Sequence, residues 1–267
     1  MIALHARRSH DSIARWYQMR GSHGLMVILT GTDLYRDIRD DSHAKLSLQM
    51  AQRLIVLQSA GLDELTHSQR AKTSVIYQST TKRKTLVKTS RHLRAVMVGH
   101  LRTEKSPETL FEAAKLLTKH KNIFIQHIGA GLDSGLADSA RSTATLCRNY
   151  KWLGALGHSQ TRTLIQRAHV LIHASTMEGG AHTIMEAIRS GVPVIASQIP
   201  GNVGMLGNDY SGYFPVGAAN RLADTLLRCR ESTDLLDELK LQCARRESLF
   251  DPDTERSNLI DAIEKLS

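Results

Sequence analysis

The chain has 267 residues, 41% of them hydrophobic, which suffices for the core of one large or two modest domains. No apolar run reaches the roughly 18 residues of a membrane span, and Arg7 and Arg8 interrupt the N-terminal apolar start that a secretory signal requires. The net charge of +9 attracts anions, but aromatic residues make up only 4% and do not interleave with the basic run at 81–84, which argues against nucleic acid as the partner.

The first third of the chain alternates apolar runs with helical patterns, as in a parallel sheet covered by helices. Strands are predicted at residues 2–4, 25–29, 54–57 and 74–77, and helices at 9–19 and 42–50. The polar stretch 78–92 shows no periodicity. We therefore expect an N-terminal Rossmann-like domain at residues 1–85 and a linker at 86–93.

A second alternating unit follows. Strands are predicted at residues 95–98, 123–128 and 169–173, with a further apolar strand after Gly191. Helices are predicted at 106–120, 135–147 and 159–167, then twice between 219 and 249, and last at 254–265. Ser106 is the expected N-cap of the first of these helices, with Pro107 in its first turn. We expect a C-terminal domain at 94–248 and a helix within 249–267 that packs back towards the N-terminal domain.

The most informative segment joins a glycine turn to a predicted helix. Glu178 precedes Gly179–Gly180, and Glu186 lies eight positions after Glu178. A glycine turn lets backbone N–H groups approach an anion, and a helix N-terminus adds partial positive charge that suits a diphosphate. Glu178 can reach a sugar hydroxyl, and Glu186 can accept hydrogen bonds from a diol such as ribose. A plain strand–turn–helix is the alternative, which the Ser190–Ile195 strand entry in register after Glu186 disfavours.

This block resembles the Glu-x7-Glu signature of retaining glycosyltransferases with the GT-B fold. The resemblance implies an α/β fold, with two Rossmann-type domains built on parallel sheets and a nucleotide-sugar held against the second domain. It also implies that Glu178 is catalytic and that Glu186 binds substrate. The turn residues implied as substrate-binding are Gly179, Gly180, Ala181, His182 and Thr183. His182 stands where many members have an apolar residue, so we expect backbone contacts there.

A second motif, from Gly99 to Lys105, resembles the Gly-Arg-Leu-x3-Lys motif of the same enzymes. There the arginine and lysine hold the diphosphate, and cations at a strand end stabilise a leaving diphosphate. Lys105 matches the motif, His100 replaces its arginine, and Arg102 can supply the missing charge. As plain loop cations near a helix N-terminus, Arg102 and Lys105 would be mildly unfavourable. The glycines that resemble the family's Gly-x-Gly turn before the nucleobase region are Gly129 and Gly131.

In the N-terminal domain, the turn after the second predicted strand resembles the family's His-Gly-Thr-Asp turn, with Thr30 in place of the histidine. Gly31 and Asp33 therefore carry over as loop formers that face the cleft, without a histidine role. His5, at the end of the first strand, is a neighbouring candidate because ligands bind at the carboxyl ends of strands in open α/β sheets. Arg7 and Arg8 follow His5 and would place positive charge on the acceptor side. The alternative is that they are solvated arginines at the start of a helix.

Three sequence segments, at residues 2–9, 29–38 and 98–105, together resemble the selenosugar synthases of selenoneine biosynthesis. Those enzymes join selenophosphate to the sugar of a UDP-sugar, usually UDP-N-acetylglucosamine, and give a 1-seleno-sugar. A basic acceptor pocket built from His5, Arg7, Arg8 and Arg36 would attract the selenophosphate anion. A soft selenium nucleophile needs little general-base help, so the loss of a histidine at Thr30 is tolerable.

Two other functions stay open at this stage. One is an ordinary GT-B glycosyltransferase with a saccharide or lipid acceptor. The other is a non-catalytic UDP-sugar-binding remnant, because the chain begins at the first strand without the family's opening glycine loop, and we expect its N-terminal domain to be truncated. We expect no cofactor and no metal, since the three cysteines form no CxxC pair or His/Cys cluster. We expect a cytoplasmic location and leave the oligomeric state open.

Overall fold

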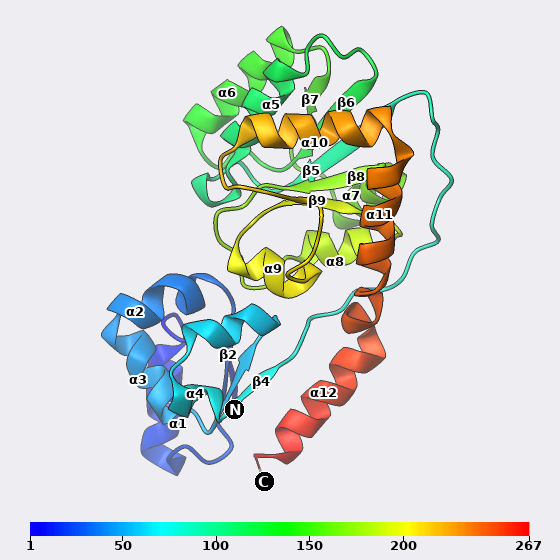
Figure 1. The fold of residues 1–267 in the computed structure, drawn as a ribbon. Helices are drawn as coiled ribbons and strands as arrows, with labels where there is room; N and C mark the ends of the chain where they lie inside the picture. The colour runs from blue at the N-terminus through cyan, green and yellow to red at the C-terminus, as the bar shows by residue number, and fades with distance from the viewer. Residues whose placement is uncertain (267) are drawn as a thin grey trace.

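The computed structural model describes residues 1–266. Within these residues ten strands form two fully parallel sheets, one from each part of the chain (Figure 1). The N-terminal sheet has the order β1-β2-β3-β4, and the C-terminal sheet the order β10-β9-β8-β5-β6-β7. The strands are β1 Ile2–Leu4, β2 Met26–Leu29, β3 Arg53–Val56, β4 Thr73–Val75, β5 Leu93–Val98, β6 Ile123–Ile128, β7 Tyr150–Trp152, β8 Val170–His173, β9 Val194–Ser197 and β10 Tyr213–Phe214.

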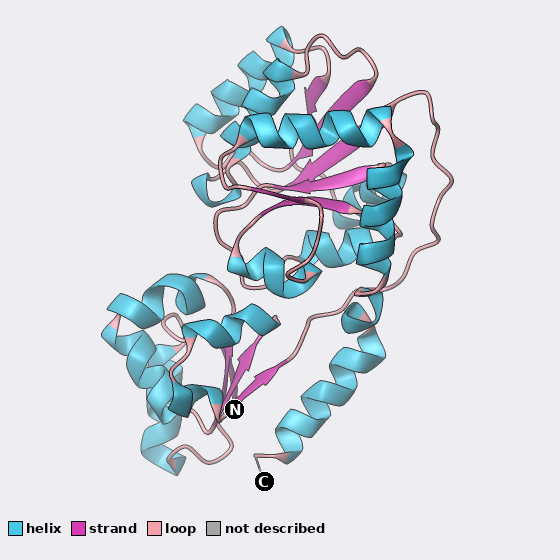
Figure 2. Cartoon of the chain, in the orientation of Figure 1, coloured by secondary structure: helices cyan, strands magenta, loops and turns pink. Residues whose placement is uncertain are grey.

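Helices cover both sheets on both faces (Figure 2). The helices of the N-terminal part are α1 His10–Arg20, α2 Ile38–Asp40, α3 Ser42–Met50 and α4 His67–Arg70. Those that follow are α5 Pro107–Leu116, α6 Ser134–Leu146, α7 His158–Arg167, α8 His182–Ile188, α9 Pro200–Leu206, α10 Ala219–Glu231, α11 Thr233–Ala244 and α12 Pro252–Glu264. Parallel strands buried on both faces are continuously apolar, which explains why the sequence predicts these strands well.

The N-terminal sheet is sandwiched between helices from opposite ends of the chain. On one face, Ile13 of α1 and Leu48 of α3 pack into a cluster with Leu29 and Leu54 of the strands. On the other face α12 places Ala262 in a cluster with residues of β2 and β3. The C-terminal helix therefore completes the core of the N-terminal sheet (Figure 1).

The C-terminal sheet is wound in both directions from β5. Right-handed crossovers from β5 to β6 and β7 place α5 and α6 on one face, and the return to β8 and β9 places α7 and α8 on the other. Helix α10 packs against α5 and closes the first layer. The strand order reverses between β5 and β8, so their carboxyl-end loops diverge and leave the crevice where ligands bind in such sheets.

Two segments connect the sheets: the outgoing connection after β4 and the segment that returns to α12. Two buried arginines, Arg162 and Arg189, hold them in place. Arg162 of α7 donates to Thr80 Oγ1 at 2.6 Å and to the Thr81 carbonyl at 2.8 Å. Arg189, at the end of α8, donates to the Thr80 carbonyl at 3.2 Å and lies 2.9 Å from Asp251, the N-cap of α12. The outgoing connection and the returning helix therefore meet at Arg189.

The structure differs from the sequence-based elements in several places. Ser106 precedes α5 in a left-handed conformation (φ 47°), and its hydroxyl bonds Thr109 Oγ1, so the predicted N-cap bond to the backbone is absent. The preceding 3₁₀ turn, Thr103–Lys105, dictates this entry. Helix α5 ends at Leu116, earlier than predicted, and β7, α9 and β10 were not predicted. Within residues 1–266 no helix is long and apolar enough to cross a membrane.

Candidate active site

The candidate active site lies where carboxyl-end loops of the C-terminal sheet meet a loop of the N-terminal sheet. The loop after β8 carries Glu178 and Gly179, and the loop after β2 carries Thr30 and Gly31. A Cβ on Gly179 would stand 2.1 Å from the Thr30 carbonyl oxygen, and one on Gly31 would stand 3.1 Å from the Gly179 nitrogen. Because only glycine at position 179 permits this approach, the two backbones touch directly beside Glu178.

Glu178 is held by three donors that approach the same carboxylate oxygen. Lys105 Nζ forms an ion pair with Glu178 Oε1, Ser175 Oγ donates to it at 2.8 Å, and His173 Nε2 lies 3.5 Å away. The Glu178 side chain is 13% exposed and that of Lys105 is 21% exposed. Within the described residues no hydrogen bond reaches Oε2. That oxygen can accept a hydrogen bond from a ligand hydroxyl.

The surroundings of Glu178 keep it ionised. Burial alone would raise the pKa of this carboxyl, but the hydrogen bond and charge of His173, and then those of Lys105, outweigh burial and lower the pKa to about 2. Glu178 is therefore a carboxylate at any ordinary pH. It suits the acceptance of hydroxyl hydrogen bonds and the stabilisation of positive charge, and it does not suit general-acid catalysis.

Glu186 is buried on α8 and is held from α7. His158 Nε2 lies 2.7 Å from Glu186 Oε1, and Arg162 Nε lies 3.9 Å from the same oxygen. The Glu186 side chain is 6% exposed, whereas that of His158, the first residue of α7, is 77% exposed. As at Glu178, the second carboxylate oxygen has no hydrogen-bond partner in the part of the chain that the structure describes.

The protein partners of the two glutamates were not predicted from the sequence. His158 and His173 had no evident partners in the sequence, yet each lies against one of the two glutamates. His173 ends β8 and His158 starts α7, so both contacts depend on how the elements pack. No local spacing in the sequence signals such contacts, and Ser175 and Arg162 were missed for the same reason.

The loops after β5 and β6 pack against each other through glycines. A Cβ on Gly129 would stand 1.9 Å from the Gly99 carbonyl oxygen, so the backbones are in contact. Leu101 and Gly131 continue this contact as an isolated parallel bridge. Gly99 and the Gly129–Gly131 turn therefore build the loop that places Lys105, and the structure gives them a structural role there.

His100 and Arg102 differ in how they are held. The His100 ring is exposed, and its Nδ1 accepts a hydrogen bond from the Ala130 N–H at 3.0 Å, which joins the two loops. The Arg102 side chain is exposed and makes no hydrogen bond or ion pair within residues 1–266. Lys105 is thus the cation of this motif that the structure brings onto Glu178.

The turn from Gly179 to Thr183 leads into α8. Gly180 packs beside Leu57 of the N-terminal part, and the Ala181 N–H donates to Met205 Sδ at 3.1 Å. His182 is exposed and Thr183 is half-buried, and both lie in the first turn of α8, where N–H groups have no intrahelical acceptor.

Asp33 is buried and links two loops of the N-terminal part by hydrogen bonds. Its side chain is fully buried. One carboxylate oxygen accepts from the Thr30 and Gly31 N–H groups, both at 2.9 Å, and the other accepts from the Ala6 N–H at 2.9 Å. Asp33 thereby joins the loops after β1 and β2, and the expectation that it faces the cleft is corrected to this structural role.

The loop after β1 and the segment after β2 together form a charged cluster. His5 is buried with a left-handed backbone (φ 70°), and its Nε2 lies 2.9 Å from Thr32 Oγ1. Arg7 Nε lies 3.1 Å and Arg36 Nε 3.2 Å from the carboxylate of Asp37, so the two arginines share one carboxylate. The three cations expected beside His5 are Arg7, Arg8 and Arg36, and all three are exposed.

A pocket of about 210 Å³ opens beside Glu178, with walls from both parts of the chain. Tyr35, Arg39 and Glu64 line it from the N-terminal part, and Arg39 and Glu64 form an ion pair there. The other lining residues are Thr176, Met177, Glu178, Ile199, Pro200 and Gly201. In the described residues no group of three or more His, Cys, Asp or Glu side chains is arranged to hold a metal.

Two curated proteins are similar to this chain in sequence. The chain is similar to a glycosyltransferase 1 domain-containing protein of Xenopus tropicalis, with 29% identity over 45% of this chain and 35% of that protein. It is also similar to the GtfA subunit of a UDP-N-acetylglucosamine–peptide N-acetylglucosaminyltransferase of Streptococcus pneumoniae, with 23% identity over 79% of this chain and 38% of that protein. The chain thus spans little more than a third of the length of either curated relative.

The fold matches solved glycosyltransferase structures. Anabaena Alr3699/HepE in complex with UDP superposes with a TM-score of 0.80 at 16% identity, over 99% of this chain and 78% of that one. The α/β fold with two parallel sheets is therefore GT-B-like, as the sequence predicted. Residues 78–243, well over half of the chain, match the family described as glycosyl transferases group 1. This chain belongs to the glycosyl transferases group 1 family.

Proposed function

We propose that the protein is a glycosyltransferase that moves a sugar from a UDP-sugar, UDP-N-acetylglucosamine, to selenophosphate and yields a 1-seleno-sugar for selenoneine biosynthesis. The observation that carries the proposal is the placement of Lys105 and Glu178 in contact beside the loop of the opposite sheet, with Glu186 eight residues further on. The Lys105 cation suits a diphosphate. Each of the two carboxylates has an oxygen available, one for a sugar hydroxyl and one for a ribose diol.

The donor lies against the C-terminal sheet in this proposal. Lys105 holds the diphosphate, with the backbone of the turn at 180–183 beside it. Glu178 Oε2 accepts a hydrogen bond from a sugar hydroxyl, and Glu186 accepts from the ribose, as in the Glu-x7-Glu enzymes that the chain resembles. The UDP complex of the structural neighbour and the UDP-N-acetylglucosamine in the name of the pneumococcal relative support this choice of donor.

The acceptor enters from the N-terminal side. Arg7 and Arg36 share the single carboxylate of Asp37, and Arg8 is exposed, so the cluster around His5 keeps excess positive charge. A small, highly charged anion such as selenophosphate matches this charge. The resemblance of residues 2–9, 29–38 and 98–105 to selenosugar synthases supports the same acceptor.

The reaction proceeds by substitution at the anomeric carbon. The selenium of selenophosphate forms the Se–C1 bond while the bond from C1 to the diphosphate oxygen breaks, and UDP departs with that electron pair. Water then cleaves the P–Se bond and releases phosphate and the 1-seleno-sugar. Lys105 offsets the charge of the departing diphosphate, and the ionised Glu178 faces the positive charge that develops on the sugar.

Mass spectrometry of a reaction with UDP-N-acetylglucosamine and fresh selenophosphate tests the proposal. A product with the selenium isotope pattern, formed together with UDP, is expected from the chain and not from its Lys105→Met variant. UDP release without a selenium product, in the presence of saccharide acceptors, would instead identify an ordinary glycosyltransferase. UDP binding without any turnover would identify a non-catalytic binding protein.

A further inference from the structure

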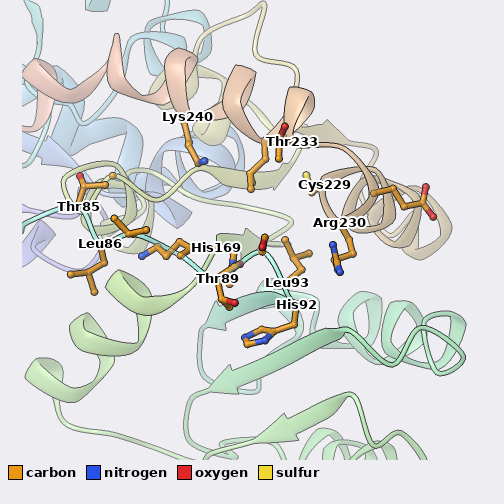
Figure 3. Close-up of a pocket in the computed structure, with 16 residues that line it drawn as sticks. Thr85, Leu86, Thr89, His92, Leu93, His169, Cys229, Arg230, Thr233 and Lys240 are labelled. Atoms are coloured by element: carbon orange, nitrogen blue, oxygen red, sulfur yellow. The ribbon is translucent and has the colours of Figure 1, made fainter.

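A second cavity, of about 480 Å³, lies away from the candidate active site. It is lined by residues 85–90 of the connection between the sheets and by residues of α10 and α11 (Figure 3). Leu93 begins β5 and His169 precedes β8, so the cavity is at the amino ends of these strands. Lys105 and Glu178 follow the carboxyl ends of the same strands, which places the two sites at opposite edges of the sheet.

The cavity has an apolar lining between two separate walls. The connecting segment contributes Leu86, α10 contributes Cys229 and β5 contributes Leu93 (Figure 3). Leu236 of α11 also lines the cavity. Its volume falls in the range of roughly 300–1,000 Å³ that is typical of small-molecule sites.

The charged groups around the cavity are mainly cations without acidic partners. Lys88 Nζ donates to the Gln166 carbonyl, and Arg230 donates to the Arg91 carbonyl at 3.1 Å, so neither is paired with a carboxylate within residues 1–266. Lys240 is paired along its own helix with the exposed Asp237, at 2.8 Å. The one acidic residue of the lining is Glu231.

These cations act on one another. Burial, together with the charges of Arg94 and Lys240, lowers the pKa of Lys88 to about 8. Burial also lowers the pKa of His92, and Arg94 and Arg230 add to the effect. Like charges gathered in a partly buried space are unfavourable unless an anion offsets them.

We propose that this cavity is a binding site for a small organic anion that carries a phosphate or carboxylate on an apolar body. The anionic group lies between Lys88 and Lys240, and the apolar body rests on Leu93 and Leu236. Lys88 has three N–H donors and uses one on the Gln166 carbonyl, which leaves two for the anion. The site is independent of the glycosyl-transfer site and of the function proposed for it.

Isothermal titration calorimetry on the full chain tests the site, with excess UDP present to occupy the donor site. Phenyl phosphate and benzoate are the probes, because each combines an anionic group with an apolar ring. Inorganic phosphate supplies the charge alone and benzyl alcohol the ring alone. At least one aromatic anion is expected to bind several-fold tighter than both partial probes, and the better of the two identifies the anionic group. Binding of both no tighter than the partial probes would overturn the proposal.

Two variants place the binding in this cavity. Lys88→Gln is expected to weaken the better probe about tenfold, since a charge-assisted hydrogen bond is lost. Lys84→Gln is the matched control, because Lys84 is an exposed lysine of the same segment that does not line the cavity, and it should change the affinity less than about twofold. Lys240→Gln gives a second test on an exposed helix position. Unchanged affinity in both Lys88→Gln and Lys240→Gln, with native melting temperatures, would also overturn the proposal.

Discussion

Lys105 and Glu178 form an ion pair that joins the loop after β5 to the loop after β8. The two residues come from separate motifs, and the resemblance assigns them different parts of a nucleotide-sugar. His173 and then Lys105 lower the pKa of Glu178 and so hold it ionised. A diphosphate would therefore compete with Glu178 for the ammonium group, while the other oxygen of Glu178 remains available.

Removal of the Lys105 charge is expected to weaken UDP binding about tenfold or more. Lys105→Met deletes a charge-assisted contact to the diphosphate while it keeps the length of the aliphatic chain. Titration calorimetry with UDP gives the affinity. Lys119→Met, at an exposed lysine beyond α5, is the control and should bind like the native chain. Equal affinities for the two variants would contradict the role of Lys105.

The stability of the protein should depend on Glu178 in acid. Its pKa is about 2 in the folded chain against 4.5 as an ordinary value, a difference worth about 3 kcal/mol at neutral pH. Because the folded-state pKa is depressed, this stabilisation is complete above about pH 4.5 and is lost as the pH falls towards 2. Urea unfolding from pH 6 downwards should show the native chain losing its advantage over Glu178→Gln in that window. A constant difference across these pH values would refute the assignment.

Glu186 is expected to read the ribose. The native chain should bind UDP about tenfold tighter than 2′,3′-dideoxy-UDP, because two hydroxyl contacts are lost. Glu186→Gln should bind UDP more weakly and lose most of this discrimination. Glu178→Gln is the matched control, since it alters a carboxylate of the same motif and should keep the discrimination. Loss of discrimination in the Glu178 variant alone would show that the ribose is bound by Glu178 and not by Glu186.

The contact between Gly179 and Thr30 predicts a sharp response to one methyl group. Gly179→Ala places a Cβ 2.1 Å from the Thr30 carbonyl oxygen, so the loops must separate, and we expect a loss of about 1–3 kcal/mol in unfolding free energy. Gly135→Ala, in the first turn of α6 where the nearest atom is 3.4 Å from the added Cβ, should be neutral or slightly stabilising. Urea unfolding measures both, and equal midpoints would show that the loops do not depend on this approach.

Arg189 is expected to hold the connection between the sheets in place and to protect it from proteolysis. Arg189→Met leaves Asp251 and the Thr80 carbonyl without their buried donor, with an expected cost of about 3 kcal/mol. Trypsin should then cut faster among the basic residues at 82–88. Arg167→Met, at an exposed arginine that ends α7, serves as the control. Cleavage at the native rate would mean that Arg189 does not secure the crossing.

The sequence predicted most of the strands from their continuous apolar runs and the long helices from their periodicity. Val194–Ser197, for example, is buried at every position and read clearly as an apolar strand. Helix α9 and the two-residue β10 were missed, because a seven-residue helix with two glycines and a very short strand give little periodic signal. The left-handed Ser106 was missed because it depends on the 3₁₀ turn before it.

The candidate site was only partly visible in the sequence. Motif spacing pointed to Lys105, Glu178 and Glu186, whose backbone positions follow from strand ends and one helix. It could not show His158 against Glu186 or His173 against Glu178, since these contacts arise between separate elements of the folded sheet. The roles of Lys105, Glu178 and Glu186 in binding and catalysis stay predictions until the variants are measured.

The hydrogen bond between the Ala130 N–H and His100 Nδ1 fixes the tautomer of the imidazole. A ring nitrogen that accepts a hydrogen bond carries no proton, so the single proton of this ring is on Nε2. An imidazolium has no acceptor nitrogen, so His100 can hold the turn or carry a positive charge, but never both at once. The arginine of the related motif faces no such choice because its charge is permanent. While this hydrogen bond holds, the position therefore offers a single Nε2–H donor where the related motif has a guanidinium group.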